Sequence, residues 1–342
     1  MAILTEKFNT VHDTAPFSAI AEKDYIPAFE EGIALTLKEI EDIVSNPEPP
    51  TFANTIEALA YSGLTLDRIS NLFFNLHSAE TNDKLEKIAQ EVAPKLSALG
   101  NDITLNIDLF SRVKVVYDQK STLNLTPEQE TLLEKSFKDF ARNGALLNDE
   151  QKQKLRDIDS KLAVLKLKYG ENVLADSNAY QLQITNEKDL AGLPEGVIEA
   201  AASLAKSESK EGWIFTLDYP SYIPFVTYAD NRDLRKEITL AAGRKGFQQN
   251  DNNNESNVLE IAKLRHQRAQ LLGYKTHADF VLAERMAESP AKVLAFLNDL
   301  LEKAKPAAQQ EFEELTAFAK QKDGIEQLEK WDGSYYSEKL KQ

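Results

Sequence analysis

A helical period of apolar residues runs through most of the chain, and it constrains the fold more than any other feature. Between Tyr25 and Val44, apolar residues recur at spacings of three and four, which places them along one side of a helix. The same period returns in segments 51–76, 85–99, 103–117 and 155–169. We therefore expect residues 1–175 to form a domain of antiparallel helices joined by short links.

Proline and glycine residues set the expected helix ends. Ser289 can cap a helix whose first turn holds Pro290, and Gly324 is expected to end that long helix. Pro306 lies inside the same helix and predicts a kink there. Gly100 is expected to separate two helices of the first domain.

A short part of the second half has the pattern of a small sheet. Residues 180–185 alternate between polar and apolar types, and residues 213–219 are rich in aromatic and β-branched types. We expect these segments to form two strands that pair, followed by a stiff turn bracketed by Pro220 and Pro224. Residues 176–342 are thus expected to be helical with short strands, and the whole chain to be mainly α.

Composition excludes several classes of function. The chain has no cysteine, so disulfides, thiolate nucleophiles and Cys-ligated metal sites cannot form. A net charge of −15 argues against nucleic-acid binding, which depends on Lys and Arg contacts with phosphates. No run of about 18 apolar residues occurs, so we expect no membrane association. The first residues lack the pattern of a signal peptide, so we expect a cytoplasmic protein.

Few residues are available for acid–base or metal chemistry. The histidines are His12, His77, His266 and His277, and no two of them have the spacing of an H-E-x-x-H helix. Nucleophile-elbow, dinucleotide-binding and phosphate-loop motifs are absent as well. We expect all four histidines to be structural or surface residues, the chain to bind no metal, and no residue to be catalytic. An alternative hypothesis assigns an unrelated chemistry to His266 and neighbouring acids.

Aromatic residues crowd between positions 213 and 228. One interpretation is core packing behind the two strands. The other is the wall of a peptide-binding groove, in which a free strand edge offers main-chain hydrogen bonds. On the second interpretation, the candidates for contact with a peptide in a substrate channel are Trp213, Tyr222 and Tyr228.

Four segments, in this order, resemble the thimet oligopeptidase/neurolysin family of zinc metallopeptidases, of the oligopeptidase A and peptidyl-dipeptidase type. They are residues 222–235, 264–274, 285–290 and 331–340, and residues 24–30 and 51–59 are also similar. The resemblance implies a mostly helical fold divided by a channel, and zinc-assisted hydrolysis of short peptides. Members of this family hold zinc with an H-E-x-G-H helix and a downstream glutamate, and the H-E-x-G-H motif does not occur in this sequence.

The resemblance therefore implies a partial peptidase. We expect the N-terminal, non-catalytic half of such an enzyme, inactive alone, which forms one wall of the substrate channel. Residues 176–342 would lead into a missing C-terminal catalytic domain that binds the zinc. Short peptides are the expected partners of the parent protein, and self-association is expected through the face that truncation exposes. The alternative is a stand-alone helical peptide-binding protein without catalysis.

Overall fold

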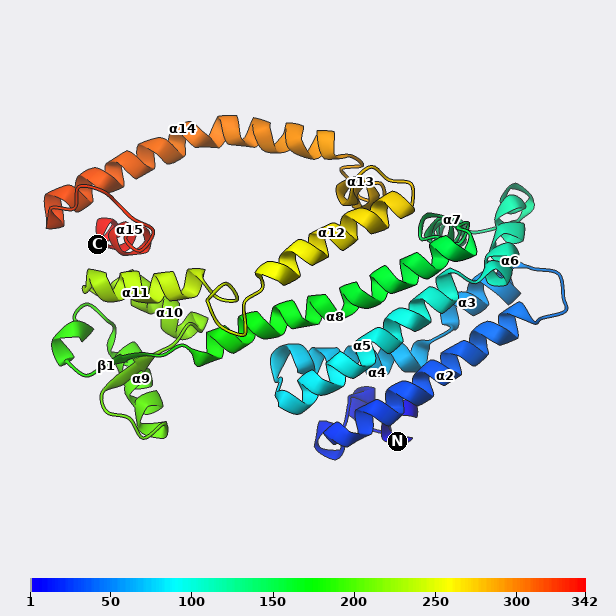
Figure 1. Ribbon diagram of the computed structural model, residues 1–342, viewed down its shortest axis with the longest axis horizontal. Helices are drawn as coiled ribbons and strands as arrows, with labels where there is room; N and C mark the ends of the chain where they lie inside the picture. Colours follow the sequence, from blue (N-terminus) through cyan, green and yellow to red (C-terminus); the bar gives the residue numbers. More distant parts are fainter. Residues whose placement is uncertain (1) are drawn as a thin grey trace. The chain divides into compact units, whose positions relative to one another are not determined.

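The computed structural model describes residues 2–342 as a helical chain with one small sheet (Figure 1). The chain divides into two compact units, each made of two segments. Unit 1 comprises Met1–Leu167 and Glu260–Phe280, and unit 2 comprises Lys168–Leu259 and Val281–Gln342. The predicted mainly α class is confirmed, whereas the predicted domain boundary after residue 175 stays a prediction. Within the described residues, no helix has the length and apolar character needed to cross a bilayer.

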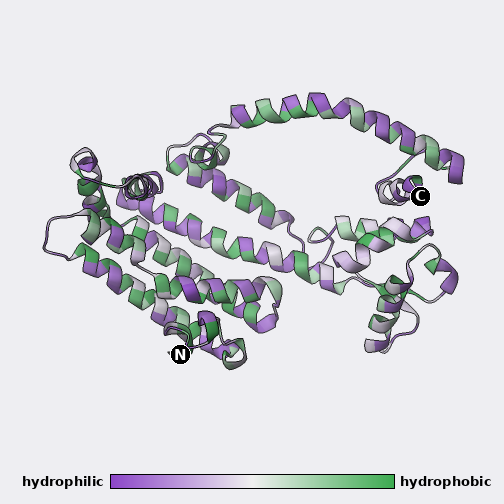
Figure 2. Cartoon of the chain, turned by 180° about the vertical axis from the view of Figure 1, so that it is seen from behind, coloured by the Kyte–Doolittle hydropathy of each residue, from purple (hydrophilic) through white to green (hydrophobic). Residues whose placement is uncertain are grey.

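Unit 1 is a helical bundle built on α2. This helix spans Tyr25–Val44, as the apolar period predicts, and packs against α4 (Leu64–Ala79) and α5 (Asp83–Thr104). Phe29 and Phe73 are fully buried between these helices with their rings edge to face, 5.4 Å apart. Figure 2 shows that the helices carry both hydrophobic and hydrophilic residues, as helices packed along one side do.

Further helices complete unit 1 around this bundle. They are α1 (Ala2–Thr5), α3 (Ala58–Tyr61), α6 (Ile107–Asp118) and α7 (Pro127–Arg142). Three more helices have residues in both units, namely α8 (Asp149–Ala179), α12 (Glu255–Leu271) and α13 (His277–Leu282).

Two helix ends in unit 1 differ from the expectation. The predicted break at Gly100 is wrong, because α5 continues through it with a helical backbone to Thr104. The next helix begins where Asn106 caps it, since its Oδ1 accepts hydrogen bonds from the N–H groups of the two residues after Ile107. Segment 51–76 is not one helix, because Gly63 adopts a left-handed backbone with φ of 76° just before α4.

Unit 2 contains the sheet. Strands β1 (Leu182–Ile184) and β2 (Trp213–Phe215) pair antiparallel, with Gln183 opposite Ile214. The prediction of two paired strands is confirmed, and the alternation holds because the ends of β1 are buried while Gln183 is exposed. Helix α9 (Glu195–Ser207) packs against β2.

The predicted stiff turn at Pro220 and Pro224 is wrong, because both lie in helix α10 (Tyr219–Tyr228). Pro220 occupies the first turn, where an N–H group has no partner inside the helix. Pro224 removes one further N–H, whose partner would have been the carbonyl of Pro220. Phe225 is fully buried with its ring 4.6 Å from that of Phe215, so tertiary burial stabilises the helix despite the prolines.

Three helices follow in unit 2, namely α11 (Arg232–Gly243), α14 (Pro290–Asp323) and α15 (Gly333–Lys341). Helix α14 has the ends that the sequence predicts: Ser289 Oγ accepts from the N–H of Lys292, and Gly324 has φ of 71°. Figure 1 shows that α14 is bent along its length.

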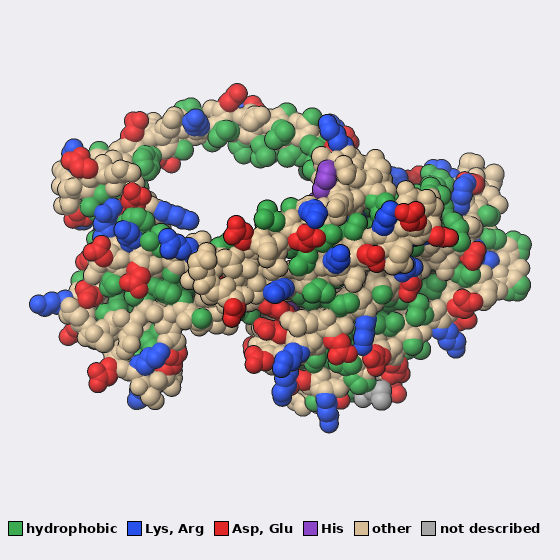
Figure 3. Space-filling view, viewed as in Figure 1, with side chains coloured by type: hydrophobic (Ala, Val, Ile, Leu, Met, Phe, Trp, Pro, Cys, Tyr) green, Lys and Arg blue, Asp and Glu red, His purple; other side chains and the backbone are tan. Residues whose placement is uncertain are grey.

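Hydrophobic side chains gather along one side of α14 (Figure 3). Its exposed large apolar residues are Leu294, Phe296, Leu297, Leu300, Leu301 and Phe312. Ala319 is the buried residue of this helix, among those the structure describes.

The asparagine-rich run after α11 folds around a buried carboxylate. Asp176 is 2% exposed and accepts hydrogen bonds from the N–H of Gly246 and from the side-chain amides of Asn250 and Asn252. Burial acts to raise the pKa of Asp176, but these hydrogen bonds outweigh it and hold the pKa below its usual range. The asparagine-rich run is therefore a loop held in place by its hydrogen bonds to Asp176.

Candidate functional site

The three aromatic residues proposed from the sequence all lie in unit 2. Trp213 begins β2, and Tyr222 and Tyr228 lie on α10. Each is partly buried and packs against the hydrophobic cluster that contains Phe215 and Phe225. The structure therefore brings them to one core, and their contact with a peptide stays a prediction.

Two of the segments that resemble the peptidase family meet inside unit 2. Arg235 of α11 and Asp332, just before α15, are 1% and 0% exposed and form an ion pair of 3.2 Å. Arg232 binds the same carboxylate, with its Nε and Nη2 atoms 2.9 and 2.7 Å from the two oxygens. Such a bidentate pair has the fork geometry that favours arginine over lysine.

Arg235 also forms hydrogen bonds with backbone carbonyls, and an aromatic ring packs on the flat face of its guanidinium. Its guanidinium donates to the carbonyls of Ala229, Asp230 and Trp331. The ring of Tyr335 lies 3.9 Å from the guanidinium carbon. Arg235 thus joins the end of α10, the start of α11 and the segment before α15.

Electrostatics keeps Asp332 charged in this buried position. Burial acts to raise the pKa of Asp332, but the hydrogen bonds from Arg232, the Glu329 N–H and Arg235 outweigh it. The pKa of Asp332 therefore lies below its usual range. The sequence analysis did not predict the ion pairs of Asp332. The available signal was that Arg232 and Arg235 lie three residues apart and have no acidic residue three or four positions away with which to form an ion pair.

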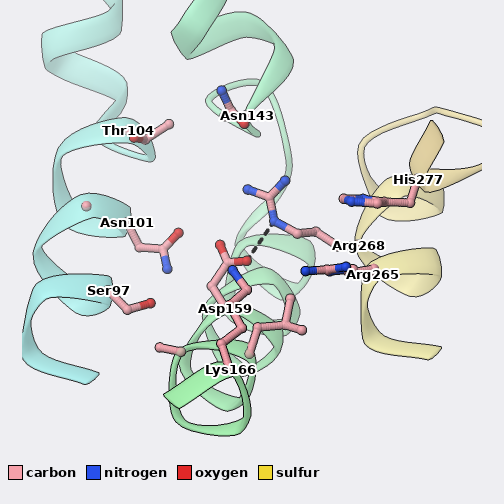
Figure 4. A pocket seen from close by; sticks show the side chains of 12 residues that line it. Ser97, Asn101, Thr104, Asn143, Asp159, Lys166, Arg265, Arg268 and His277 are labelled. Carbon is pink, nitrogen blue, oxygen red and sulfur yellow. Dashed lines mark hydrogen bonds and ion pairs between the residues drawn. The ribbon is translucent and has the colours of Figure 1, made fainter. Parts of the chain in front are cut away.

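A cavity of about 550 Å³ lies within unit 1 (Figure 4). Its basic side chains are Lys166 of α8, Arg265 and Arg268 of α12, and His277 of α13. Its neutral polar side chains are Ser97, Asn101 and Thr104 of α5, and Asn143 after α7; Figure 4 shows the residues of α5 across the cavity from those of α12 and α13. We call this space the cationic cavity.

The positive charge of the cationic cavity is only partly compensated. Arg268 Nε lies 2.7 Å from the carboxylate of Asp159, which also lines the cavity. Among the described residues, none forms a hydrogen bond or an ion pair with the head group of Lys166 or Arg265. Burial and the charges of Arg265, Arg268 and Lys166 hold the pKa of His277 below its usual range, so its imidazole is neutral at pH 7.

The resemblance implies zinc, but the donor groups do not fit a zinc site. Within the part of the chain that the structure describes, no three His, Cys, Asp or Glu side chains are placed to share a metal ion. The histidines are also dispersed: His12 and His266 are exposed, and His77 packs on Phe73. His277 faces the cationic cavity.

Comparison with known proteins identifies the relatives of this chain. Residues 225–342 match peptidase family M3. Oligopeptidase A of Salmonella typhimurium and of Escherichia coli are 34% and 33% identical to the chain, each over 99% of its length. Dipeptidyl carboxypeptidase of Escherichia coli is 30% identical over 95% of the chain. The resemblance predicted from the sequence is confirmed, and the chain is similar over nearly all of its length to oligopeptidase A and dipeptidyl carboxypeptidase.

The chain matches only part of the length of each relative. The chain spans about half the length of the curated relatives it matches, namely 50% of both oligopeptidase A proteins and 48% of the dipeptidyl carboxypeptidase.

Replacing Arg235 with Met is expected to destabilise the protein by about 3–5 kcal/mol, because a buried carboxylate loses one of its two cationic partners. Urea unfolding followed by circular dichroism measures the change. Because the folded-state pKa of Asp332 is lowered, its ion pairs stabilise the fold at neutral pH, and this contribution disappears as the pH falls through that pKa. The difference between the variant and the parent should therefore shrink in acid.

The matched control is Arg244→Met, at an exposed arginine just after α11. We expect this variant to stay within about 0.5 kcal/mol of the parent. Equal losses in the two variants would contradict a special role for Arg235.

Proposed function

We propose that this chain is the N-terminal, non-catalytic portion of a zinc-dependent oligopeptidase or peptidyl-dipeptidase that acts on short peptides in the cytoplasm. The observation that carries the proposal is the alignment of 99% of the chain with half of oligopeptidase A. The lack of a metal-ligand set among residues 2–342 supports it, since metallopeptidases need such a set. The zinc ligands of the parent protein would then lie in the half that this chain does not match.

In this proposal, unit 2 contributes one wall of the substrate channel. Trp213, Tyr222 and Tyr228 would contact the peptide, because each ring is anchored in the core and still keeps part of its surface exposed. Aromatic rings fixed in this way offer apolar contact at a low cost in side-chain entropy. The two-stranded sheet has outer edges whose main-chain groups can pair with an extended peptide.

The chain alone is expected not to hydrolyse peptides, even with added zinc, because the described residues offer no ligand set. Internally quenched peptides of about ten residues provide the assay, with oligopeptidase A as the positive control. Cleavage that increases with zinc and stops with a chelator would refute the proposal.

The aromatic residues Trp213, Tyr222 and Tyr228 are expected to bind a short peptide weakly, with a dissociation constant of about 1 mM, since only one side of the channel is present. Chemical-shift changes in NMR spectra measure this binding. Tyr222→Ala should weaken it several-fold. Tyr219→Ala is the matched control, because Tyr219 lies on the same helix and is 80% exposed.

Two other outcomes of the peptide titration are informative. Equal effects of the two tyrosine variants would remove Tyr222 from the channel wall. Micromolar or tighter capture without cleavage would favour the stand-alone peptide-binding protein.

The apolar side of α14 is expected to cause self-association, because two copies of the chain can bury these water-exposed apolar side chains against each other. Sedimentation velocity over a range of concentrations should show dimers of the parent chain. Leu297→Lys combined with Leu301→Lys should give monomers. Glu302→Gln, on the same helix, is the control and should leave the dimers intact; a monomeric parent chain would contradict this prediction.

A further inference from the structure

We propose that the cationic cavity binds a small carboxylate-bearing molecule, of the chemical class of a short peptide with a free C-terminus. Residues of unit 1 alone line this site, whereas the aromatic candidates for the channel wall lie in unit 2, so the two sets share no residue. The inference therefore does not depend on the proposed function.

The first argument is the unpaired positive charge. The chain has 55 acidic and 40 basic residues, so a lysine or arginine on its surface has an excess of acids to pair with. Some lysines on the helices pair in this way, such as Lys154 with Glu150, and others do not; the cavity differs because Lys166, Arg265 and Arg268 are gathered around one space. Lys166 and Arg265 in the cavity have no such partner among the described residues. The lining thus carries three cationic groups, Lys166, Arg265 and Arg268, against the one carboxylate of Asp159, and an excess of one charge attracts ligands of the opposite sign.

The second argument is the geometry of the two arginines. Arg265 and Arg268 are three residues apart on α12, so they lie on the same side of the helix, and both line the cavity (Figure 4). Asp159 binds Arg268 through Nε only. The Nη atoms of Arg268 and the whole guanidinium of Arg265 remain available for the paired hydrogen bonds that a carboxylate accepts.

The third argument is the polar wall that faces the cations. Asn101 is only 8% exposed, yet no described residue forms a hydrogen bond with its side-chain amide, which Figure 4 shows directed into the cavity. Its amide atoms remain accessible from the space of the cavity, so a ligand or water there can bond to them. Ser97 and Thr104 lie on the same side of α5. These groups can bond to the amide of a peptide whose carboxylate meets the arginines.

The volume of the cavity agrees with such a ligand. About 550 Å³ lies within the range of roughly 300–1,000 Å³ that small-molecule sites occupy. Leu162 and Ala163 of α8 are the apolar side chains among its lining residues, and most of the other lining side chains are polar or charged.

His277 provides a built-in reporter of binding. The groups that face it are Arg265 and Arg268 of α12 and Lys166 of α8, all of which lower its pKa together with burial. An anion bound among these cations would offset their effect, so the pKa of His277 should rise on binding.

The experiment titrates the full chain with N-acetyl-alanyl-alanine while NMR follows the imidazole signal of His277 against pH. We expect saturable binding and a raised pKa of His277. The C-terminal amide of the same dipeptide differs only in the charged group, and we expect it to bind at least tenfold more weakly. This comparison needs no variant, so it does not depend on the folding of a mutant.

Variants then assign the site. Arg265→Met and Lys166→Met should each weaken binding about tenfold, whereas Lys161→Met, on α8 but outside the cavity, should not change it. No shift of His277 with the dipeptide, or an equal shift with its amide, would overturn the proposal. Tighter binding of inorganic phosphate than of the dipeptide would overturn the assignment to a carboxylate. The zinc-dependence assay is unaffected by any of these outcomes.

Discussion

The buried carboxylate of Asp332 is the constraint around which unit 2 is organised. A charge that is removed from water must be paired and hydrogen-bonded, and here two arginines and a backbone N–H meet that need. Arg235 and Asp332 are 97 residues apart in the sequence. Their ion pair therefore holds α11 against the start of α15. The aromatic segment 331–336 is thereby held against the helices that follow the sheet.

Local patterns in the sequence predict the elements whose stability is itself local. The period of α2, the serine cap of α14 and the alternation in β1 each reflect neighbouring residues, and all three agree with the structure. The wrong prediction of a turn at Pro220 and Pro224 concerns a tertiary effect. Nothing near Pro224 in the sequence signals that burial of Phe225 stabilises a helix there.

The candidate site was harder to predict than the fold. Four sequence segments that occur in the same order as in the peptidase family were enough to indicate that family, because a match between sequences needs no knowledge of the structure. The cationic cavity was not foreseen, since its lining comes from α5, α8, α12 and α13, whose residues are far apart in the sequence. His277 was expected to be a structural or surface residue, and nothing in the sequence pattern singled out Arg265. Only the fold shows that they share a cavity from which acidic partners are largely missing.

The asparagine-rich loop carries a chemical vulnerability. Asn250 and Asn252 both donate to Asp176 through side-chain amides. Spontaneous deamidation would convert either amide into a carboxylate, which cannot donate and would repel Asp176 at hydrogen-bonding distance. The loop therefore depends on covalent integrity as well as on packing, and slow ageing of these asparagines would loosen it without any change in the encoded sequence.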